Sequence, residues 1–421
     1  MLKKNVFMLV PFLLFGGMLY AGGGGQAADA KAGKVELTFY YPTQVGGNLA
    51  QRMEKIVSGF NANNGKGITV IPVYTGSYKQ TAQKAMSDIA AGNGPDVVLS
   101  GMLDIVDYYG VGAVRDISDY IKGEGADWQK DFIDGFWGNF VFEDGGIYGL
   151  PFQHSVCVLY YNMDILNAAG ITAPPSTQEE MLRAAAAVRA YDKNIVPVEF
   201  PADVWVLEAL TLSSSDMLVK NRRETNFNSP AAVSSLDFLR GLVNGGAMIQ
   251  SYAAAAEDFV AESCAMMFNT TGNLGFVSQS AAYSWGVTMM PVKTSPGLSY
   301  GGGGMIMIAG QNPEKEAASW EFMKYMTSPE VSAQWMTVSG YFAVRKSSND
   351  LKIVKDYYAV NPQVAQAAEL LKYTQAQWST DKYWDVYAYM QTALDNTLIG
   401  GNAQAAGALA KAQSDSMALF K

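Results

Sequence analysis

The sequence predicts an α/β protein made of two lobes, and three observations support this fold class. The chain of 421 residues is long enough for two ordinary domains, and 49% of its residues are apolar against 16% charged, which suits a buried core. Strand and helix patterns alternate along the chain, as in a parallel sheet covered by helices on both faces. The alternation starts again after Pro151, which predicts a second lobe.

The first part of the chain shows this alternation clearly. Apolar residues at every second position predict a strand at residues 35–39, and a one-sided apolar pattern predicts a helix at residues 49–60. A strand at residues 68–74, a helix at residues 82–89 and a strand at residues 96–99 follow. These elements predict the first parallel sheet.

After Pro151 the elements are predicted by similar signals. Residues 156–161 form an apolar run of strand length, as expected in a sheet buried on both sides. Ser176 and Glu179 have capping-box spacing, which predicts a helix that continues to Val188. Further short strands are predicted at residues 196–200, 264–268 and 286–290.

Three helices are predicted to begin where a capping residue precedes a first-turn proline. These pairs are Ser229-Pro230, Asn312-Pro313 and Ser328-Pro329. The glycine run at residues 301–304 predicts a loop that leads into a strand at residues 305–309. From residue 346 onward the pattern is mostly helical.

The N-terminus has the pattern of a secretory signal peptide. Lys3 and Lys4 precede an uncharged run at residues 6–21, which is short for a membrane span but suits the apolar region of such a peptide. Cleavage is predicted after Ala21 or Ala27, with residues 22–33 as a flexible leader remnant; a membrane anchor is the alternative. No cysteine lies near this segment, which excludes lipid attachment at an N-terminal Cys.

Composition argues against several classes of protein. A net charge of −9 disfavours nucleic acid, whose binding depends on Lys and Arg. Cys157 and Cys264 lie in apolar runs, which favours buried inert thiols, with a single disulfide between them as the alternative.

Catalytic and cofactor motifs are missing from the sequence. His154 is the single histidine, so a His-rich metal site, a two-His metalloprotease motif and a zinc finger are excluded. No serine in a nucleophile elbow could partner it, and no phosphate-cradling or dinucleotide-binding loop occurs. We therefore expect no metal and no cofactor, and we expect His154 to be a structural or ligand-contacting ring.

Aromatic residues are abundant, with 23 Tyr, 19 Phe and 8 Trp. Their faces pack against the C–H faces of sugars, and their OH or NH groups orient polar ligands in a cleft. The alternative for any single ring is a place in the core. Carboxylate pairs also leave glycoside hydrolysis open, although no particular pair is marked.

Six segments, in order, resemble the extracellular solute-binding proteins of ABC transporters. They are YTGSY at residues 74–78, GNGPD at 92–96, LPFQHSVCVLYYN at 150–162, GVTMMP at 286–291, ASWEFMK at 318–324 and SGYFAVR at 339–345. The resemblance covers residues 35–345 and is looser beyond them. It is closest to the branch that binds glycerol phosphate, glycerophosphodiesters and oligosaccharides.

This resemblance implies a two-lobed periplasmic-binding-protein fold, type II-like, in which each lobe is a mostly parallel sheet flanked by helices. Residues 34–149 and 297–342 would form one lobe, residues 150–296 and 343–421 the other, and the ligand would lie in the cleft between them. It also implies an exported monomer that hands a small-molecule ligand to the permease subunits of an ABC importer, in the periplasm or another extracytoplasmic space.

By position, the resemblance also implies which residues contact the ligand. They are Tyr78, Ser155, Trp205, Thr271, Asn273, Gly302, Tyr341, Trp384 and Tyr387.

Two positions depart from the phosphate-binding branch. Met102 stands where that branch has an acidic residue for the glycerol hydroxyls, and Tyr387 stands where it has a phosphate-binding arginine. Because a guanidinium is the strongest phosphate-recognising group, its loss favours an uncharged sugar. A glycerophosphodiester is the alternative ligand, and a secreted carbohydrate-active enzyme is the alternative class.

Overall fold

The computed structural model describes residues 34–43, 48–374, 379–401 and 403–421. Lys34–Lys421 form one compact unit. The predicted signal peptide and leader remnant lie outside the described residues. Across the part of the chain that is described, no helix combines the length and the apolar character needed to cross a bilayer.

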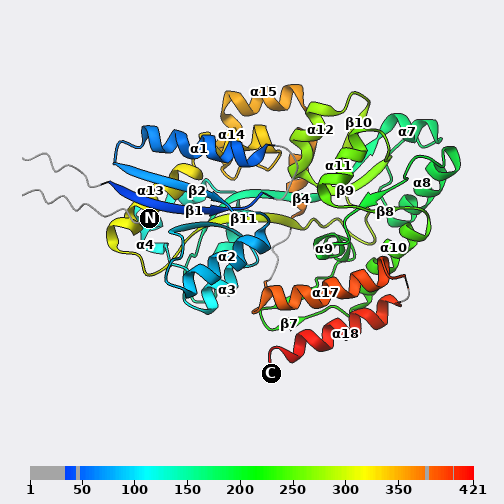
Figure 1. Cartoon of the computed structure of the whole chain (residues 1–421). Coiled ribbons are helices and arrows are strands. Elements are labelled where there is room, and N and C mark those ends of the chain that lie inside the picture. The colour runs from blue at the N-terminus through cyan, green and yellow to red at the C-terminus, as the bar shows by residue number, and fades with distance from the viewer. Residues whose placement is uncertain (1–33, 44–47, 375–378, 402) are drawn as a thin grey trace, which may run out of the picture. The chain divides into compact units, whose positions relative to one another are not determined.

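Strands from both halves of the chain join in one sheet. In the described residues its order is β2-β1-β3-β11-β4-β9-β5-β8, and β10 also pairs with β4 (Figure 1). The strands are β1 (Val35–Tyr41), β2 (Ile68–Tyr74), β3 (Val97–Gly101), β4 (Leu150–Asn162), β5 (Glu199–Phe200), β8 (Met248–Ile249), β9 (Met266–Thr270), β10 (Trp285–Met289) and β11 (Tyr300–Met307). A separate hairpin contains β6 (Val219–Asn221) and β7 (Glu224–Thr225).

The parallel strands confirm the alternation predicted from the sequence. β1 pairs with β2 and β3 in parallel, and β5 pairs with β8 and β9 in parallel. β11 and β4 are antiparallel to their neighbours. β5 is much shorter than the predicted strand at residues 196–200, because Val196 forms only an isolated bridge, to Cys264.

β4 is the strand that both halves of the fold share. Its first half pairs with β11, and its second half pairs with β9 on one edge and β10 on the other. Val156, Val158 and Tyr160 pack into a first hydrophobic cluster, whereas Cys157 and Leu159 pack into a second. Because successive side chains of a strand point to opposite faces, one apolar run serves both clusters.

Helices cover the sheet on both sides (Figure 1). Their bounds are α1 (Leu49–Asn63), α2 (Tyr78–Ala90), α3 (Ile105–Gly110), α4 (Ser118–Glu124), α5 (Ala126–Lys130), α6 (Asp134–Trp137), α7 (Met163–Ala168), α8 (Gln178–Tyr191), α9 (Val204–Leu212), α10 (Pro230–Asn244), α11 (Tyr252–Val260), α12 (Leu274–Ser280), α13 (Pro313–Met326), α14 (Pro329–Ser339), α15 (Lys352–Val360), α16 (Pro362–Glu369), α17 (Tyr383–Leu398) and α18 (Ala405–Ala418).

Capping residues begin several helices as predicted. The side chains of Ser229, Asn312 and Ser328 accept backbone N–H bonds at the starts of α10, α13 and α14. The capping box of α8 was predicted one residue too early. Thr177, rather than Ser176, is extended and accepts from the N–H of Glu180, so the box joins Thr177 and Glu180.

The glycine run at residues 301–304 was predicted as a loop, and this prediction was wrong. These glycines lie inside β11, between β3 and β4. A Cβ on Gly302 would overlap the carbonyl oxygen of Gln153, and a Cβ on Gly303 would overlap that of Ser100. Glycine is needed here because the neighbouring backbones approach too closely for a side chain.

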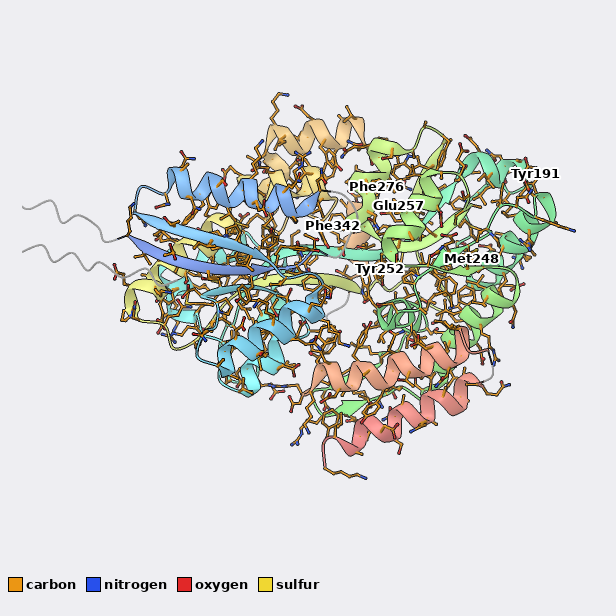
Figure 2. All side chains as sticks on the ribbon, viewed as in Figure 1. Tyr191, Met248, Tyr252, Glu257, Phe276 and Phe342 are labelled. Carbon is orange, nitrogen blue, oxygen red and sulfur yellow. The ribbon has the colours of Figure 1, made fainter. Side chains whose placement is uncertain are left out.

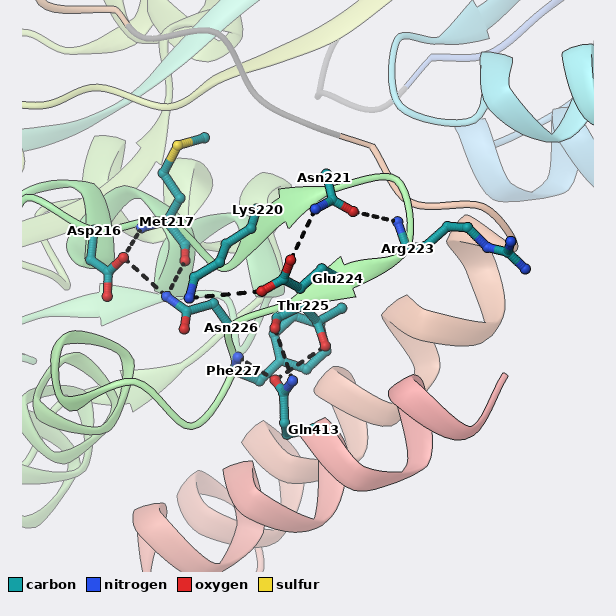
Figure 3. A network of polar contacts seen from close by, with 10 residues as sticks. All are labelled: Asp216, Met217, Lys220, Asn221, Arg223, Glu224, Thr225, Asn226, Phe227 and Gln413. Carbon is teal, nitrogen blue, oxygen red and sulfur yellow. Dashed lines mark hydrogen bonds and ion pairs between the residues drawn. The ribbon is translucent and has the colours of Figure 1, made fainter. Parts of the chain in front are cut away.

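α17 and α18 lie side by side and carry the C-terminal end of the chain (Figure 1). Gln413 on α18 holds the β6–β7 hairpin through three hydrogen bonds (Figure 3). Its Oε1 accepts from the N–H of Phe227 at 2.7 Å and from the Thr225 hydroxyl at 3.1 Å, and its Nε2 donates to the Thr225 carbonyl at 2.8 Å. The hairpin is thereby fixed to α18.

The two cysteines are buried and unpaired, so the disulfide alternative does not hold. Burial raises the pKa of both thiols well above the ordinary value, which keeps them protonated.

Candidate ligand-binding site

A cavity of about 370 Å³ lies where both halves of the fold contribute residues. The start of α2 and the end of β3 form one side, and the middle of β4 and the first residues of β11 form the floor. α9, the start of α11 and the start of α17 complete the wall. A cavity of this size is in the range that holds small-molecule ligands.

Seven of the nine residues proposed from the sequence line this cavity. They are Tyr78, Ser155, Trp205, Gly302, Tyr341, Trp384 and Tyr387. They come from positions between 78 and 387 of the chain, so only the folded backbone brings them together.

The other two proposed residues, Thr271 and Asn273, lie behind the wall. The Thr271 hydroxyl accepts from the N–H of Val156 at 3.0 Å. Asn273 Nδ2 donates to the carbonyl of Tyr252 at 3.1 Å and to Asn269 Oδ1 at 2.9 Å. Both side chains are fully buried, and Asn273 supports Tyr252, which lines the cavity (labelled in Figure 2).

Aromatic rings from three helices form one side of the cavity. Trp384 packs edge-on against Tyr383 and Tyr387, with ring centroids 5.0 and 5.5 Å apart. The ring centroids of Trp205 and Tyr252 are 6.0 Å apart. A Cβ on Gly301 would lie 3.0 Å from the Trp205 ring, so the glycine-rich β11 leaves room for this indole.

Gln153 and Trp335 hold the side chains of Tyr78 and Tyr341 in place. Gln153 Nε2 donates to the Tyr78 hydroxyl at 2.5 Å. The Tyr341 ring stacks on Trp335 at 6.4 Å, directly after the left-handed Gly340 that ends α14. Burial raises the pKa of both phenols, so both remain neutral.

Three carboxyl groups also line the cavity, and the sequence reasoning did not select them. Asp203 caps α9, where Oδ1 accepts from the N–H of Trp205 at 2.8 Å and Oδ2 accepts from the Tyr387 hydroxyl at 3.0 Å. Burial raises the pKa of Asp203, raises that of Glu208 to about 8, and raises that of Asp104 well above the ordinary value.

Asp104 corrects the expectation that an acidic group is lost after β3. The family resemblance placed Met102 at that position, and both Met102 and Asp104 line the cavity. The turn after β3 brings the carboxyl two residues further on to the same end of the strand, which a count along the sequence does not register. Asp203 had a usable signal, since a helix-capping aspartate two residues before Trp205 places both at one helix start.

Several hydrogen-bonding atoms around the cavity have no partner among the described residues. They include Asp104 Oδ2, Thr380 Oγ1, Trp205 Nε1 and Trp384 Nε1. Buried polar atoms are rarely left unpaired, because losing water without gaining a partner costs free energy. These atoms are available to bond a molecule that enters the cavity.

His154 does not line the cavity, although it lies on β4 beside Ser155. Its ring is fully buried and stacks on Phe136, with centroids 4.4 Å apart and planes 8° apart. Burial lowers its pKa to about 3, so the imidazole is neutral. Within the described residues, no cluster of His, Cys, Asp or Glu could hold a metal ion.

Two α/β halves joined through a shared strand, with a cavity beside that strand, form the architecture of two-lobed solute-binding proteins. The family model "bacterial extracellular solute-binding protein" matches residues 55–365. The chain therefore belongs to the bacterial extracellular solute-binding protein family.

Individual relatives agree with this assignment. The sn-glycerol-3-phosphate-binding periplasmic protein of Shigella dysenteriae is 24% identical over 340 residues, which cover 75% of this chain and 76% of the relative.

Solved structures match the fold over most of the chain. UgpB from Mycobacterium tuberculosis in complex with glycerophosphocholine has a TM-score of 0.81 at 20% identity, covering 92% of this chain and 99% of that one. An ABC substrate-binding protein of Listeria monocytogenes in complex with cycloalternan also has a TM-score of 0.81, at 18% identity and with the same coverage.

Proposed function

We propose that this chain is the extracytoplasmic binding protein of an ABC importer and that it binds a sugar or oligosaccharide in the cavity. The single observation that carries this proposal is the set of unpaired polar atoms among the aromatic rings. Two indole N–H groups need acceptors, and the Asp104 oxygen and the Thr380 hydroxyl can take further bonds. A polyhydroxylated ligand supplies donors, acceptors and C–H faces that pack on rings.

A glycerophosphodiester is the second candidate, because the relatives named above include proteins for sn-glycerol-3-phosphate and glycerophosphocholine. Among the described lining residues there is no arginine, and Lys79 is the one basic side chain. Three carboxyl groups line the same cavity, and in their ionised form they would repel a phosphate. These charges favour the sugar.

A thermal-shift screen of the purified protein against sugars and glycerophosphodiesters tests the ligand. A ligand at about 100 times its dissociation constant adds about 2.7 kcal/mol to the free energy of unfolding. We expect this gain with a sugar. Stabilisation by glycerophosphocholine and by no sugar would overturn the proposal, and turnover of a bound sugar would assign the chain to the carbohydrate-active enzymes instead.

The proposed ligand contacts are Tyr78, Ser155, Trp205, Gly302, Tyr341, Trp384 and Tyr387. Trp205→Ala should weaken sugar binding by about 0.5–1.5 kcal/mol beyond the loss of buried area. Tyr191→Ala removes an aromatic ring that is 53% exposed and does not line the cavity (labelled in Figure 2), so it serves as the control. Calorimetric titration compares the two variants, and equal affinities would remove Trp205 from the site.

The remaining parts of the proposal concern organisation and location. Residues 34–149 and 297–342 would form one lobe and residues 150–296 and 343–421 the other, with closure around the ligand. The protein would be exported by its signal peptide, act as a monomer and deliver its ligand to permease subunits. Small-angle scattering with and without sugar tests closure, and N-terminal sequencing of the exported protein tests cleavage.

A further inference from the structure

The proposed sugar cavity is acidic as well as aromatic. Asp104 and Glu208 line it with only 3% and 8% of their surfaces exposed, and Asp203 lines it at the cap of α9. Tyr383, on α17, lines the same cavity. Two separate parts of the sequence thus contribute three carboxyls to one cavity.

Positive charge is scarce at this place. Among the lining residues that the structure describes, the one basic side chain is Lys79, which is exposed. Its Nζ lies 5.8 Å from the centroid of the Trp384 ring, so it sits over an aromatic face. Three buried or half-buried carboxyls therefore face the cavity with one exposed ammonium group.

We propose that the ligand is an amino sugar, or an oligosaccharide that contains one, and that its protonated amine binds beside Asp104 and Glu208. This inference rests on the proposed function, because it takes the ligand to be a sugar held in this cavity. It replaces the uncharged sugar expected from the sequence, which did not reveal these carboxyls. An ammonium group beside a carboxyl makes a charge-assisted hydrogen bond, which is roughly twice as strong as the neutral bond that a sugar hydroxyl makes there.

The aromatic wall suits the same cation. Trp384 packs edge to face with Tyr383 and Tyr387, and the faces of such rings attract a cation electrostatically. The sugar hydroxyls would bond the two free indole N–H groups. One site thereby offers separate partners for the amine and for the hydroxyls.

The proposal also predicts that binding of the amine is coupled to release of a proton. Burial, followed by the charge of Asp203, raises the pKa of Glu208 to about 8, so this carboxyl holds a proton at neutral pH. An ammonium beside it would lower that pKa and release the proton. The other titratable groups of the cavity are Asp104, Asp203, Lys79, Tyr78, Tyr252, Tyr300, Tyr341, Tyr383 and Tyr387.

The test is calorimetric titration of the full protein with matched ligands. Glucosamine is compared with glucose and N-acetylglucosamine, galactosamine with galactose, and deacetylated chitobiose with cellobiose and the diacetylated form. We expect at least one amino sugar to bind more than about tenfold more tightly than its neutral counterparts, because a buried charge pair is worth over 1.4 kcal/mol.

Substituting the carboxyl residues tests whether they cause the preference for an amino sugar over its neutral counterpart. Glu208→Gln should reduce the preference for the amine while binding of the neutral counterpart persists, and Asp104→Asn serves if that variant does not fold. The control is Glu257→Gln, since Glu257 is exposed on α11 and does not line the cavity (Figure 2).

In the wild type, affinity for the amino sugar should fall by about tenfold from pH 7 to pH 6, because one proton must be displaced. Affinity for a neutral sugar should not change. A neutral sugar that binds as tightly as its amino counterpart overturns this inference and leaves the proposed function intact. Binding of glycerophosphocholine alone, or of no sugar at all, overturns both.

Discussion

Glu199, on β5, has 1% of its surface exposed, and one of its carboxyl oxygens has no hydrogen-bond partner in the described residues. Burial raises its pKa to about 8, and the charge of Asp258 and a hydrogen bond with it add to the shift. The ordinary value is 4.5, so between pH 4.5 and about pH 8 the folded protein keeps a proton that the unfolded chain releases. The free energy of unfolding therefore falls as pH rises through this range.

Glu199→Gln should remove this pH dependence, because the amide also bonds Asp258 but does not titrate. From pH 5 to pH 8 the wild type should lose on the order of 2–4 kcal/mol more stability than the variant. Urea unfolding at several pH values measures the difference. Parallel stability curves for the two proteins would show that Glu199 titrates normally, and Glu257→Gln supplies an exposed control.

At the scale of the element, β11 shows how local sequence and local structure disagree. Four consecutive glycines suggest a loop, yet they occupy the middle of a nine-stranded sheet, beside the cavity. Gly302 has φ +130, which an L side chain rarely adopts, and Gly304 lies against Phe140 and the carbonyl of Leu150. The glycines allow three strands and the Trp205 ring to meet in one place.

Gly302→Ala should destabilise the protein by about 2–4 kcal/mol, since both its backbone conformation and the nearby Gln153 carbonyl oppose a Cβ. Gly407→Ala is the matched control, because Gly407 lies on α18 with no atom near its Cβ position. It should raise stability by about 0.5–1 kcal/mol. Equal effects in chemical denaturation would contradict this account of β11.

At the scale of the whole molecule, Arg222 connects parts that pack against different hydrophobic clusters. It lies at the turn of the β6–β7 hairpin, where Val219 packs on the second cluster. Its guanidinium lies 5.1 and 5.6 Å from the ring centroids of Tyr109 and Phe142, which pack on the first cluster. It also pairs with Asp381 at 2.9 Å. Under the lobe arrangement proposed above, opening of the cleft would separate the guanidinium from these rings.

Arg222→Ala should therefore speed ligand release by about tenfold, because a partly buried cation–π contact contributes about 1–2 kcal/mol to the closed form. Arg223 provides the control, since its side chain is 66% exposed and lies 3.8 Å from Asp381. Stopped-flow dissociation of bound ligand measures both variants. Identical rates for Arg222→Ala and Arg223→Ala would exclude Arg222 from holding the closed form.

Much of the fold could be predicted because its signals are local. The cap-plus-proline pairs at Ser229, Asn312 and Ser328 begin helices wherever they occur, since the side chain bonds the next backbone N–H groups. Local apolar patterns also predicted β1 and β2 as strands and α1 as a helix. The boundaries of β4, β5 and β11 were missed, because strands end where their partners end.

The sequence by itself determined the α/β class and several helix starts, and through a family resemblance it selected seven residues that line the cavity. Only the tertiary structure decided that Asp104, Asp203 and Glu208 line one cavity, that Thr271 and Asn273 lie behind its wall, and that the glycines belong to a strand. The physical reason is that burial, charge proximity and backbone contact are properties of residues distant in the chain. No window of sequence contains them, and they exist only once the sheet has brought those residues together.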